Sequence, residues 1–361
     1  MAAIGRDTTP VDPMPDTLTL RRPDDFHLHL RDGEMLQAVV PPTAAVFGRA
    51  LVMPNTEPPV LTGADAERYR KEIVSALPDG AAFEPLMTIK IVPSTTPAMI
   101  RDAKAAGVVA GKLYPEGVTT NSSDGVRDVL ALGDVFAAMS DEGLVLCLHG
   151  ETPDTFCLDR EDRFVAEVLP ALARSFPDLR IVLEHVSTAA AVDWLRSDAA
   201  PATVAATVTV HHLLLTLDDV VGGLLAPHHF CKPIAKRPAD RAAIVAAAVS
   251  GDPRFFLGTD SAPHPREAKQ SAHGCAGIFT APVALPLLAT VFDAHDALAA
   301  LDDFCSGHGP RFYGLPANPG TVRLVRDPWT VPADYDGVVP LNAGTTLPWR
   351  VDGITRNGAT A

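Results

Sequence analysis

Short apolar runs recur along the chain and alternate with longer segments of helical periodicity. Runs of this length, bounded by polar or Gly- and Pro-rich stretches, are typical of buried β-strands. We expect eight strands, at residues 26–30, 49–55, 85–92, 108–114, 144–150, 181–187, 204–210 and 254–260. Helical patterns occupy several of the intervals between them, at residues 64–77, 123–143, 188–199 and 238–251.

The order of these elements predicts the fold class. Eight strands that alternate with helices are the order of an α/β protein of the (β/α)8, or TIM barrel, type, and a doubly wound parallel sheet is the rival topology. Residues 1–17 are polar and Pro-rich and are expected to form a loose N-terminal arm. We expect residues 18–361 to form a single barrel domain, with a C-terminal extension of loops and short strands over about 314–361.

Composition limits the classes of function. The net charge of −14 argues against a nucleic-acid partner, which needs a basic face, but a few local cations can still bind an anionic small molecule. The chain lacks an apolar span of 18 residues and a signal-peptide pattern at its start, so we expect no membrane association. Five cysteines without a Cys-x-x-Cys pair fit a reduced, cytoplasmic protein.

Ionisable residues gather at the ends of five predicted strands. In (β/α)8 barrels the chemistry lies at the carboxyl ends of the strands, where side chains from different strands meet. Two histidines of the first strand share one face because alternate residues point the same way. The residues at these strand ends are His27, His29, Lys112, His149, His185 and Asp260. Five strands that each bring such a residue to one end predict a common site.

Each of these residues, taken alone, has a structural alternative. The histidines suit zinc but are also common as ordinary residues of a barrel mouth. Lys112 either forms a salt bridge, since an unpaired buried cation is costly, or reacts with CO2 to give a carbamate that bridges two metal ions. Asp260 either caps a following helix or binds a metal and moves a proton. Together the six groups predict a two-metal site that activates water.

Arg31 lies two residues beyond His29 and shares its face on an extended strand end. A guanidinium can hold a carboxylate through two parallel hydrogen bonds. Arg31 is therefore a candidate for binding an anionic substrate. The alternative is a surface ion pair with Asp32 or Glu34.

Longer motifs surround these residues. The region from about Arg22 to Tyr313 contains FHLHLRDGEML, VMPNTEPPV, GKLYPEGVTTNSSDGV, LCLHGET, LEHVST, CKPIAKR and FLGTDSAPHPREAKQSAHGCAG. In these motifs, and in the succession His-x-His, Lys, His, His and Asp, the chain resembles the class II dihydroorotases of the amidohydrolase superfamily. Only 26 residues precede His27, whereas hydantoinases, allantoinases and class I dihydroorotases usually carry a longer N-terminal segment.

The resemblance implies a zinc-dependent cyclic amide hydrolase of the third step of pyrimidine synthesis. Its reaction is the reversible cyclisation of N-carbamoyl-L-aspartate to (S)-dihydroorotate. It implies two Zn²⁺ per subunit, joined by a hydroxide and by Lys112 as N6-carboxylysine. One ion is assigned His27, His29, Lys112 and Asp260, and the other is assigned Lys112, His149 and His185. Asp260 is also assigned the role of general acid and base.

The resemblance also implies a homodimer and assigns contacts with the substrate. Arg31, Asn55 and His264 are assigned to its carboxylate, and Thr119 and Thr120 to a loop that closes over it and excludes water. The full set of assigned contacts is His29, Arg31, Asn55, His149, Lys232, His264, Ala276 and Gly277. Lys232 is a departure, because relatives often place a non-polar residue there.

Several residues are predicted to be structural rather than functional. The tandem pairs His211–His212 and His228–His229 should diverge on a strand and serve as packing or rim residues, and Cys147 should belong to the core. The alternative functions are another cyclic amidase, such as a hydantoinase or allantoinase, and a catalytically silent homologue that serves as a scaffold. Arg31, Asn55 and the TDSAPH and GCAG motifs favour a carboxylated ring over the first alternative. The complete ligand set argues against the second.

Overall fold

The computed structural model describes residues 16–356 and 359–360. Within them, eight parallel strands pair with their neighbours in sequence order. These strands are β2 (Asp24–Leu28), β3 (Arg49–Val52), β4 (Glu84–Ile91), β5 (Ala110–Leu113), β6 (Val145–Leu148), β7 (Ile181–Leu183), β8 (Val204–Val208) and β9 (Phe255–Leu257). The predicted (β/α)8 barrel is confirmed, and the doubly wound sheet is excluded because strand order never reverses.

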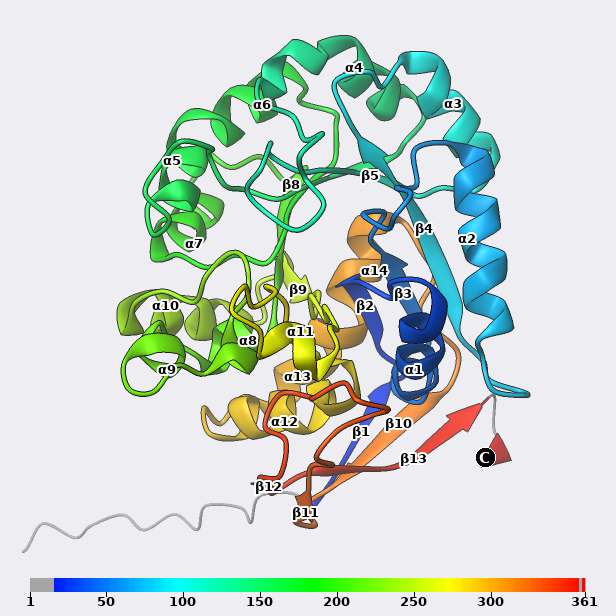
Figure 1. Cartoon of the computed structure of the whole chain (residues 1–361), viewed down its shortest axis with the longest axis vertical. Helices are drawn as coiled ribbons and strands as arrows, with labels where there is room; N and C mark the ends of the chain where they lie inside the picture. Colours follow the sequence, from blue (N-terminus) through cyan, green and yellow to red (C-terminus); the bar gives the residue numbers. More distant parts are fainter. Residues whose placement is uncertain (1–15, 357–358, 361) are drawn as a thin grey trace, which may run out of the picture.

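Helices surround the strands (Figure 1). They are α1 (Gly33–Ala44), α2 (Gly63–Ser75), α3 (Pro97–Ala105), α4 (Gly133–Asp141), α5 (Arg160–Glu167), α6 (Leu169–Ser175), α7 (Ala189–Arg196), α8 (Val210–Leu214), α9 (Asp218–Val221), α10 (Pro238–Ala248), α11 (Arg266–Lys269), α12 (Ala284–Asp293), α13 (Leu298–Ser306) and α14 (His308–Tyr313), with 3-10 turns η1 (Val129–Leu132), η2 (Pro227–His229) and η3 (Ala281–Val283). In the described part of the chain, none of them is both long and apolar enough to cross a membrane.

Most helical predictions correspond to observed helices. The patterns at 64–77, 188–199 and 238–251 occur as α2, α7 and α10. The pattern at 123–143 is only partly right, because its helical residues begin at Val129. The residues before it complete the loop after β5, where Val126 N donates to Tyr114 O at 2.8 Å.

The amino end of the barrel is filled with apolar side chains. Strand residues that point inward pack against α14 in a cluster of Phe26, Leu51, Met53, Leu86, Ala110, Val145, Cys147, Val182, Ala205, Phe256 and Tyr313. Tyr313 stacks on Phe26 with 4.6 Å between the ring centroids, and Cys147 is in the core as predicted. This layer leaves only the carboxyl end of the barrel open to polar side chains.

The barrel closes where the chain after β9 meets β2. Leu28 and Ser261 form a parallel bridge. Asp260 N donates to His27 O at 2.7 Å, and His29 N donates to Ser261 O at 2.9 Å. This pairing sets the two predicted histidine ligands beside the predicted aspartate.

A buried carboxylate reinforces the same seam. Asp25 accepts hydrogen bonds from Thr259 N at 2.8 Å and from Thr259 Oγ1 at 2.6 Å. It also accepts from His27 N at 3.1 Å. Because Asp25 is fully buried, these donors have no access to water and depend on the carboxylate.

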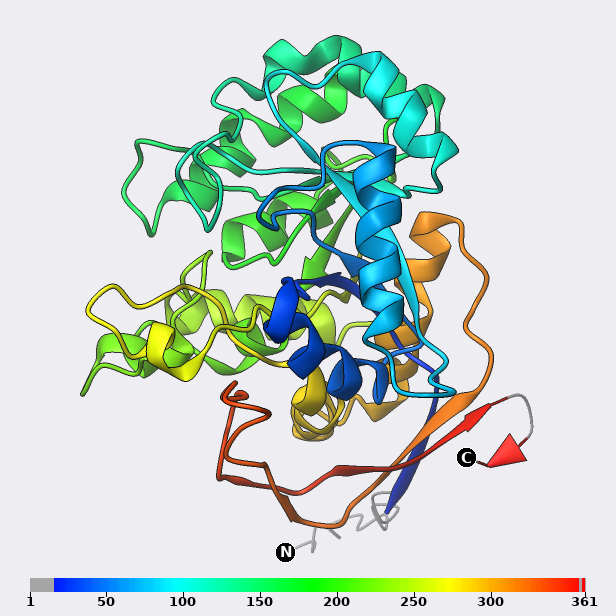
Figure 2. The same cartoon turned by 45° about the vertical axis from the view of Figure 1, so that its right-hand side comes forward.

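A separate antiparallel sheet lies beside the barrel, where β1, β10 and β13 run side by side (Figures 1 and 2). Its strands are β1 (Thr17–Arg21), β10 (Thr321–Val325), β13 (Arg350–Arg356) and β14 (Ala359–Thr360), and β11 (Trp329–Thr330) pairs with β12 (Thr346–Leu347). The predicted N-terminal arm falls largely outside the described residues, and Thr17, its last residue, begins β1. The sequence did not predict β1.

We expect Asp25→Ala to lower the free energy of unfolding by about 2–4 kcal/mol, because it leaves buried N–H and O–H donors of the closing seam without an acceptor. Urea unfolding followed by circular dichroism measures this loss. The matched control is Asp134→Ala on the exposed side of α4, which should change stability by less than about 0.5 kcal/mol. Equal unfolding midpoints for the two variants would show that Asp25 does not hold the seam.

Candidate metal centre

His27, His29 and Asp260 converge at the carboxyl end of the barrel. The Nε2 atoms of His27 and His29 lie 3.4 and 3.2 Å from Asp260 Oδ1. His27, His185 and Asp260 each offer a ligand atom within 4.8 Å of the other two, and all three are buried. Nitrogen and carboxylate oxygen donors at this spacing suit a divalent cation such as zinc.

His149 extends this group. Its ring centroid lies 4.6 Å from that of His185, which in turn lies 5.0 Å from that of His27. The structure thus brings together in one cluster the four histidines that the sequence placed on three different strands. Neighbouring rings follow one another in the order His29, His27, His185 and His149.

Lys112 lies beside these imidazoles in β5 and is fully buried. Its Nζ makes no hydrogen bond or ion pair with the described residues, and its ring contact is with Tyr114, whose centroid is 5.3 Å away. The salt bridge considered from the sequence is therefore not formed. Burial lowers the pKa of Lys112, although the negative charge of Glu184 opposes the shift. A neutral amine in this position is a nucleophile toward CO2.

Hydrogen-bond acceptors orient the imidazoles of His27 and His29 in the same way. His27 Nδ1 donates to Glu184 Oε2 at 2.8 Å. His29 Nδ1 donates to Asn55 Oδ1 at 2.7 Å. Each of these bonds leaves Nε2 as the free nitrogen, and carboxylate or amide partners of this kind make a histidine a better metal ligand.

His149 has the opposite orientation. Its Nε2 donates to Glu151 Oε2 at 2.6 Å, so Nδ1 is the nitrogen left for a metal. Burial lowers the pKa values of His149 and His185, and lowers the pKa of His29 to about 4. These three histidines are therefore neutral at pH 7, which is the form that binds metals.

Asp260 is held in its charged form. Burial alone would raise its pKa, but the electrostatic interactions of the carboxylate with the adjacent His27 and His29 outweigh this effect and lower the pKa. The carboxylate is thus available as a ligand and as a proton acceptor. The alternative role as a helix cap does not apply, because α11 begins only at Arg266.

The backbone turns sharply at three of the site residues. Arg31, His185 and Asp260 have φ values of 60°, 42° and 44°, in the left-handed region that residues other than glycine rarely adopt. Such conformations are typical of functional sites, where the surrounding structure holds them. The turn at His185 explains why β7 ends at Leu183 and not at residue 187, the predicted end of this strand. The chain leaves the sheet there, and the His185 side chain points inward.

A pocket opens above the histidines. It is lined by His27, His29, Arg31, Asn55, Tyr114, Thr119, Thr120, His149, His185, Lys232, Asp260, Ala262, Ala276 and Gly277. Thus most of the residues assigned to substrate by resemblance face one cavity. Lys112 lies beneath it, and His264 lies beside it.

Arg31 and His264 form one side of this pocket. Arg31 Nε donates to Pro263 O at 3.1 Å, and Arg31 Nη2 lies 3.1 Å from His264 Nε2. His264 Nε2 also lies 3.0 Å from Ala276 O. No ion pair joins Arg31 to Asp32 or Glu34 in the described residues, so the alternative considered from the sequence is wrong. The guanidinium therefore keeps its charge available to a ligand.

The sequence analysis missed several residues of the site. Tyr114 and Ala262 line the pocket, and Glu184 and Glu151 orient histidines. The sequence places both glutamates close to a motif histidine, since Glu184 precedes His185 in LEHVST and Glu151 follows His149 in LCLHGET. Proximity alone does not distinguish them from solvent-exposed acids.

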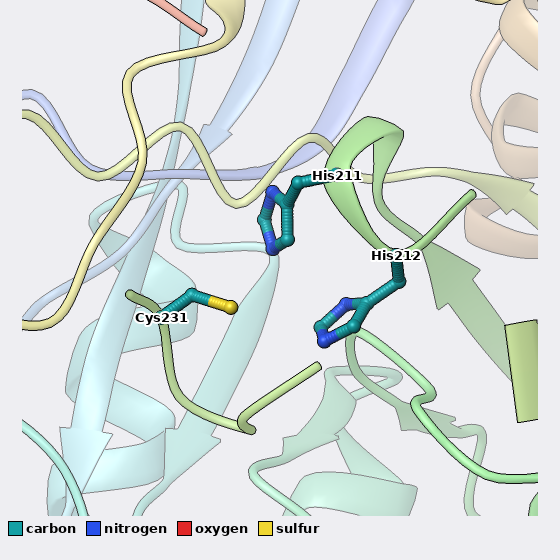
Figure 3. A group of neighbouring side chains, drawn as sticks. All are labelled: His211, His212 and Cys231. Carbon is teal, nitrogen blue, oxygen red and sulfur yellow. The ribbon is translucent and has the colours of Figure 1, made fainter. Parts of the chain in front are cut away.

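A second group of possible metal ligands comprises His211, His212 and Cys231. Figure 3 shows the Cys231 sulfur directed toward the gap between the two imidazoles. The prediction that this histidine pair diverges on a strand is wrong, because both residues lie in α8, and both are buried. The other pair, His228–His229, lies in η2.

Hydrogen bonds indicate what this second group does. His212 Nε2 donates to Pro233 O at 3.1 Å, and its Nδ1 lies 2.8 Å from Thr209 Oγ1. Cys231 Sγ donates to Pro233 O at 3.2 Å. With both nitrogens of His212 bound to the protein, the group holds the Pro233 carbonyl and does not present three free ligands.

Comparison with known proteins agrees with this geometry. The model of the amidohydrolase family matches residues 25–340. A curated dihydroorotase of Halorhodospira halophila is 53% identical over 343 residues, which cover 93% of this chain and 99% of that protein.

Solved structures extend the similarity to three dimensions. A dihydroorotase of Campylobacter jejuni shares 38% identity with a TM-score of 0.87 and covers 95% of this chain and 99% of its own. The dihydroorotase of Saccharomyces cerevisiae, solved in complex with 5-fluoroorotic acid, shares 36% identity with a TM-score of 0.87 and covers 94% and 99%. The chain therefore belongs to the amidohydrolase family and, within it, to the dihydroorotases.

Proposed function

We propose that this protein interconverts N-carbamoyl-L-aspartate and (S)-dihydroorotate at a site that holds two zinc ions. The observation that carries the proposal is the opposition of two groups in one pocket. A cluster of histidines and an aspartate lies at its floor, and a guanidinium that has no acidic partner among the described residues lies at its side. The substrate has the complementary shape, with an amide bond to be broken or formed and a carboxylate remote from it.

The residues present fit two metal ions. His27, His29 and Asp260 offer donors to one ion, and His149 and His185 offer nitrogens to the other. A carbamate on Lys112 would supply both ions with an oxygen and would replace the unsatisfied amine by an anion. Bound zinc would supply a water of lowered pKa and would polarise the carbonyl of the substrate.

Asp260 is the residue that moves the proton. In hydrolysis its carboxylate accepts a proton from the attacking water and delivers it to the departing ring nitrogen. In cyclisation the same carboxyl group returns the proton in the opposite order. The lowered pKa of Asp260 keeps this group in the carboxylate form at neutral pH.

Arg31, Asn55 and His264 bind the remote carboxylate in this proposal. The Arg31 side chain is already oriented by Pro263 O and His264, so little side-chain freedom is lost when an anion binds. Burial and the charge of Arg31 lower the pKa of His264 to about 3, so His264 acts as a neutral hydrogen-bonding group. The yeast relative was solved with 5-fluoroorotic acid, which is also a pyrimidine ring with a carboxyl group.

The same observation disfavours the alternatives. A hydantoinase or allantoinase would use the metal cluster, but it has no need of a guanidinium aimed at a ring carboxylate. A silent scaffold would have no need to keep six ligand residues buried together.

We also propose that the protein works in the cytoplasm, since its five cysteines, all within the described residues, are free.

The purified protein should consume dihydroorotate, and Arg31→Met should lower kcat/KM for dihydroorotate on the order of 100-fold, because a buried carboxylate loses its cation. Turnover of dihydrouracil, which lacks the carboxylate, should change much less. Ultraviolet absorbance follows both reactions, with hydantoin and allantoin tested in parallel.

The control for this comparison is Arg68→Met, which removes an exposed arginine of α2 and should leave both rates unchanged. Preference of the unmodified protein for hydantoin or allantoin would overturn the proposed substrate. Equal losses for dihydroorotate and dihydrouracil would remove Arg31 from substrate recognition.

The protein expressed with added zinc should hold about two zinc ions per chain, measured by atomic emission after gel filtration. Glu184→Gln should weaken metal binding about 10- to 100-fold in competition with a chelator, because it removes the charge that orients and polarises His27. Absence of zinc from the unmodified protein would count decisively against the centre.

Lys112→Ala should abolish turnover of dihydroorotate and reduce zinc content, because the bridging oxygens are lost. Acetate or propionate should restore part of the activity by occupying the space of the carbamate. Lys104→Ala, which removes an exposed lysine of α3, is the matched control and should remain fully active. Full activity of Lys112→Ala would show that Lys112 is not a bridge.

A further inference from the structure

The mouth of the pocket is covered by the loop of residues 115–126, which follows β5, the fourth barrel strand. This loop is compact, since Gly117 N donates to Ser122 O at 2.8 Å and Ser122 Oγ donates to Thr119 O at 2.6 Å. Thr119 and Thr120 at its tip line the pocket. Internal bonds of this kind let a surface loop move as a unit.

One edge of the loop is bound to neighbouring strands. Asn55 Nδ2, after β3, donates to Thr120 O at 3.3 Å, and Asn121 Nδ2 donates to Asn55 O at 3.0 Å. Lys90 Nζ of β4 donates to Asn121 O at 2.8 Å. These contacts come from the second and third barrel strands, of which the third pairs with the fourth, so they act as a hinge on that side.

Among the residues that the structure describes, one side chain reaches this loop from across the barrel. Lys232 lies between β8 and β9, the seventh and eighth barrel strands, and its Nζ donates to Val118 O at 2.7 Å. This bond spans the mouth of the pocket that both segments line. In the described residues, Lys232 forms no ion pair with a carboxylate.

The base of Lys232 is fixed by buried groups on both sides. Before it, Phe230 O accepts from Gly277 N and from Lys269 Nζ, both at 2.9 Å. After it, Pro233 O accepts from His212 and Cys231, the group in Figure 3. Its backbone is therefore part of the rigid barrel, and the half-buried side chain reaches from a fixed point to a loop.

From this geometry we infer that Lys232 is a latch, a positioning residue whose ammonium holds the loop of residues 115–126 closed before substrate arrives. The loop must detach from Lys232 to admit or release a ligand, and it reattaches by a bond that does not involve the substrate. An apolar residue at position 232 would preserve the backbone contacts and lose the latch. The inference on loop position does not rest on the proposed reaction.

Hydrogen–deuterium exchange of the zinc-loaded protein without substrate tests the latch. In Lys232→Leu, amide exchange in the peptide that covers 115–126 should accelerate about three- to tenfold, because one charge-assisted hydrogen bond no longer opposes opening. In Lys232→Arg, which keeps a cation and several donors, exchange should stay within about twofold of the original protein. Peptides of β2 and β9 should exchange equally in all variants, which shows that the barrel is intact.

Lys71→Leu, on the exposed face of α2, controls for the loss of one positive charge and should leave loop exchange unchanged. Loop exchange in Lys232→Leu equal to that of Lys71→Leu would overturn the latch. A rise in KM for dihydroorotate with unchanged loop exchange would also overturn it, since Lys232 would then act on the ligand directly. Because exchange is measured without substrate, a failure of the dihydroorotate assay would leave this result interpretable.

Discussion

Burial of the Lys112 amine beside four histidines is the constraint on which the site depends. Within the described residues, the Lys112 amine has no hydrogen-bond acceptor, and a buried charge without a partner is costly. Glu184 favours the charged amine, but its Oε2 atom is already bound to His27 and Thr207. Burial therefore favours the uncharged amine at this position.

The barrel satisfies this constraint by separating polar from apolar residues along its axis. Apolar side chains and α14 fill the amino end, so water reaches the interior only from the carboxyl end. Asp25 and the Leu28–Ser261 bridge then fix the seam at which His27, His29 and Asp260 meet. The left-handed backbone at His185 and Asp260 directs these two candidate ligands inward, at a local cost that the buried hydrogen bonds around them offset.

The site has two walls of different character. The wall formed by Arg31, His264 and the segment around Ala276 is held by part-buried side-chain bonds to the carbonyls of Pro263 and Ala276. The wall formed by the loop of residues 115–126 is held by side-chain bonds from other strands and by an ion pair between Lys90 and Asp124. With the latch inferred above, ligand exchange would occur through the loop, while the guanidinium and the histidines remain in place. This division is common in barrels, where a rigid scaffold carries mobile loops.

The sequence by itself indicated the eight barrel strands, several of the helices between them and the six ionisable residues at the carboxyl end, because each of these follows from local periodicity or from short motifs. It did not determine the roles of Glu184 and Glu151, the burial of His211 and His212, the start of the helix at Val129 or the reach of Lys232 to Val118. These depend on which residues from distant segments meet, and on backbone turns such as that at His185, where the alternation of a strand no longer predicts direction. Only the tertiary structure decides such contacts, because the partners are distant in the sequence and lie side by side only in the folded barrel.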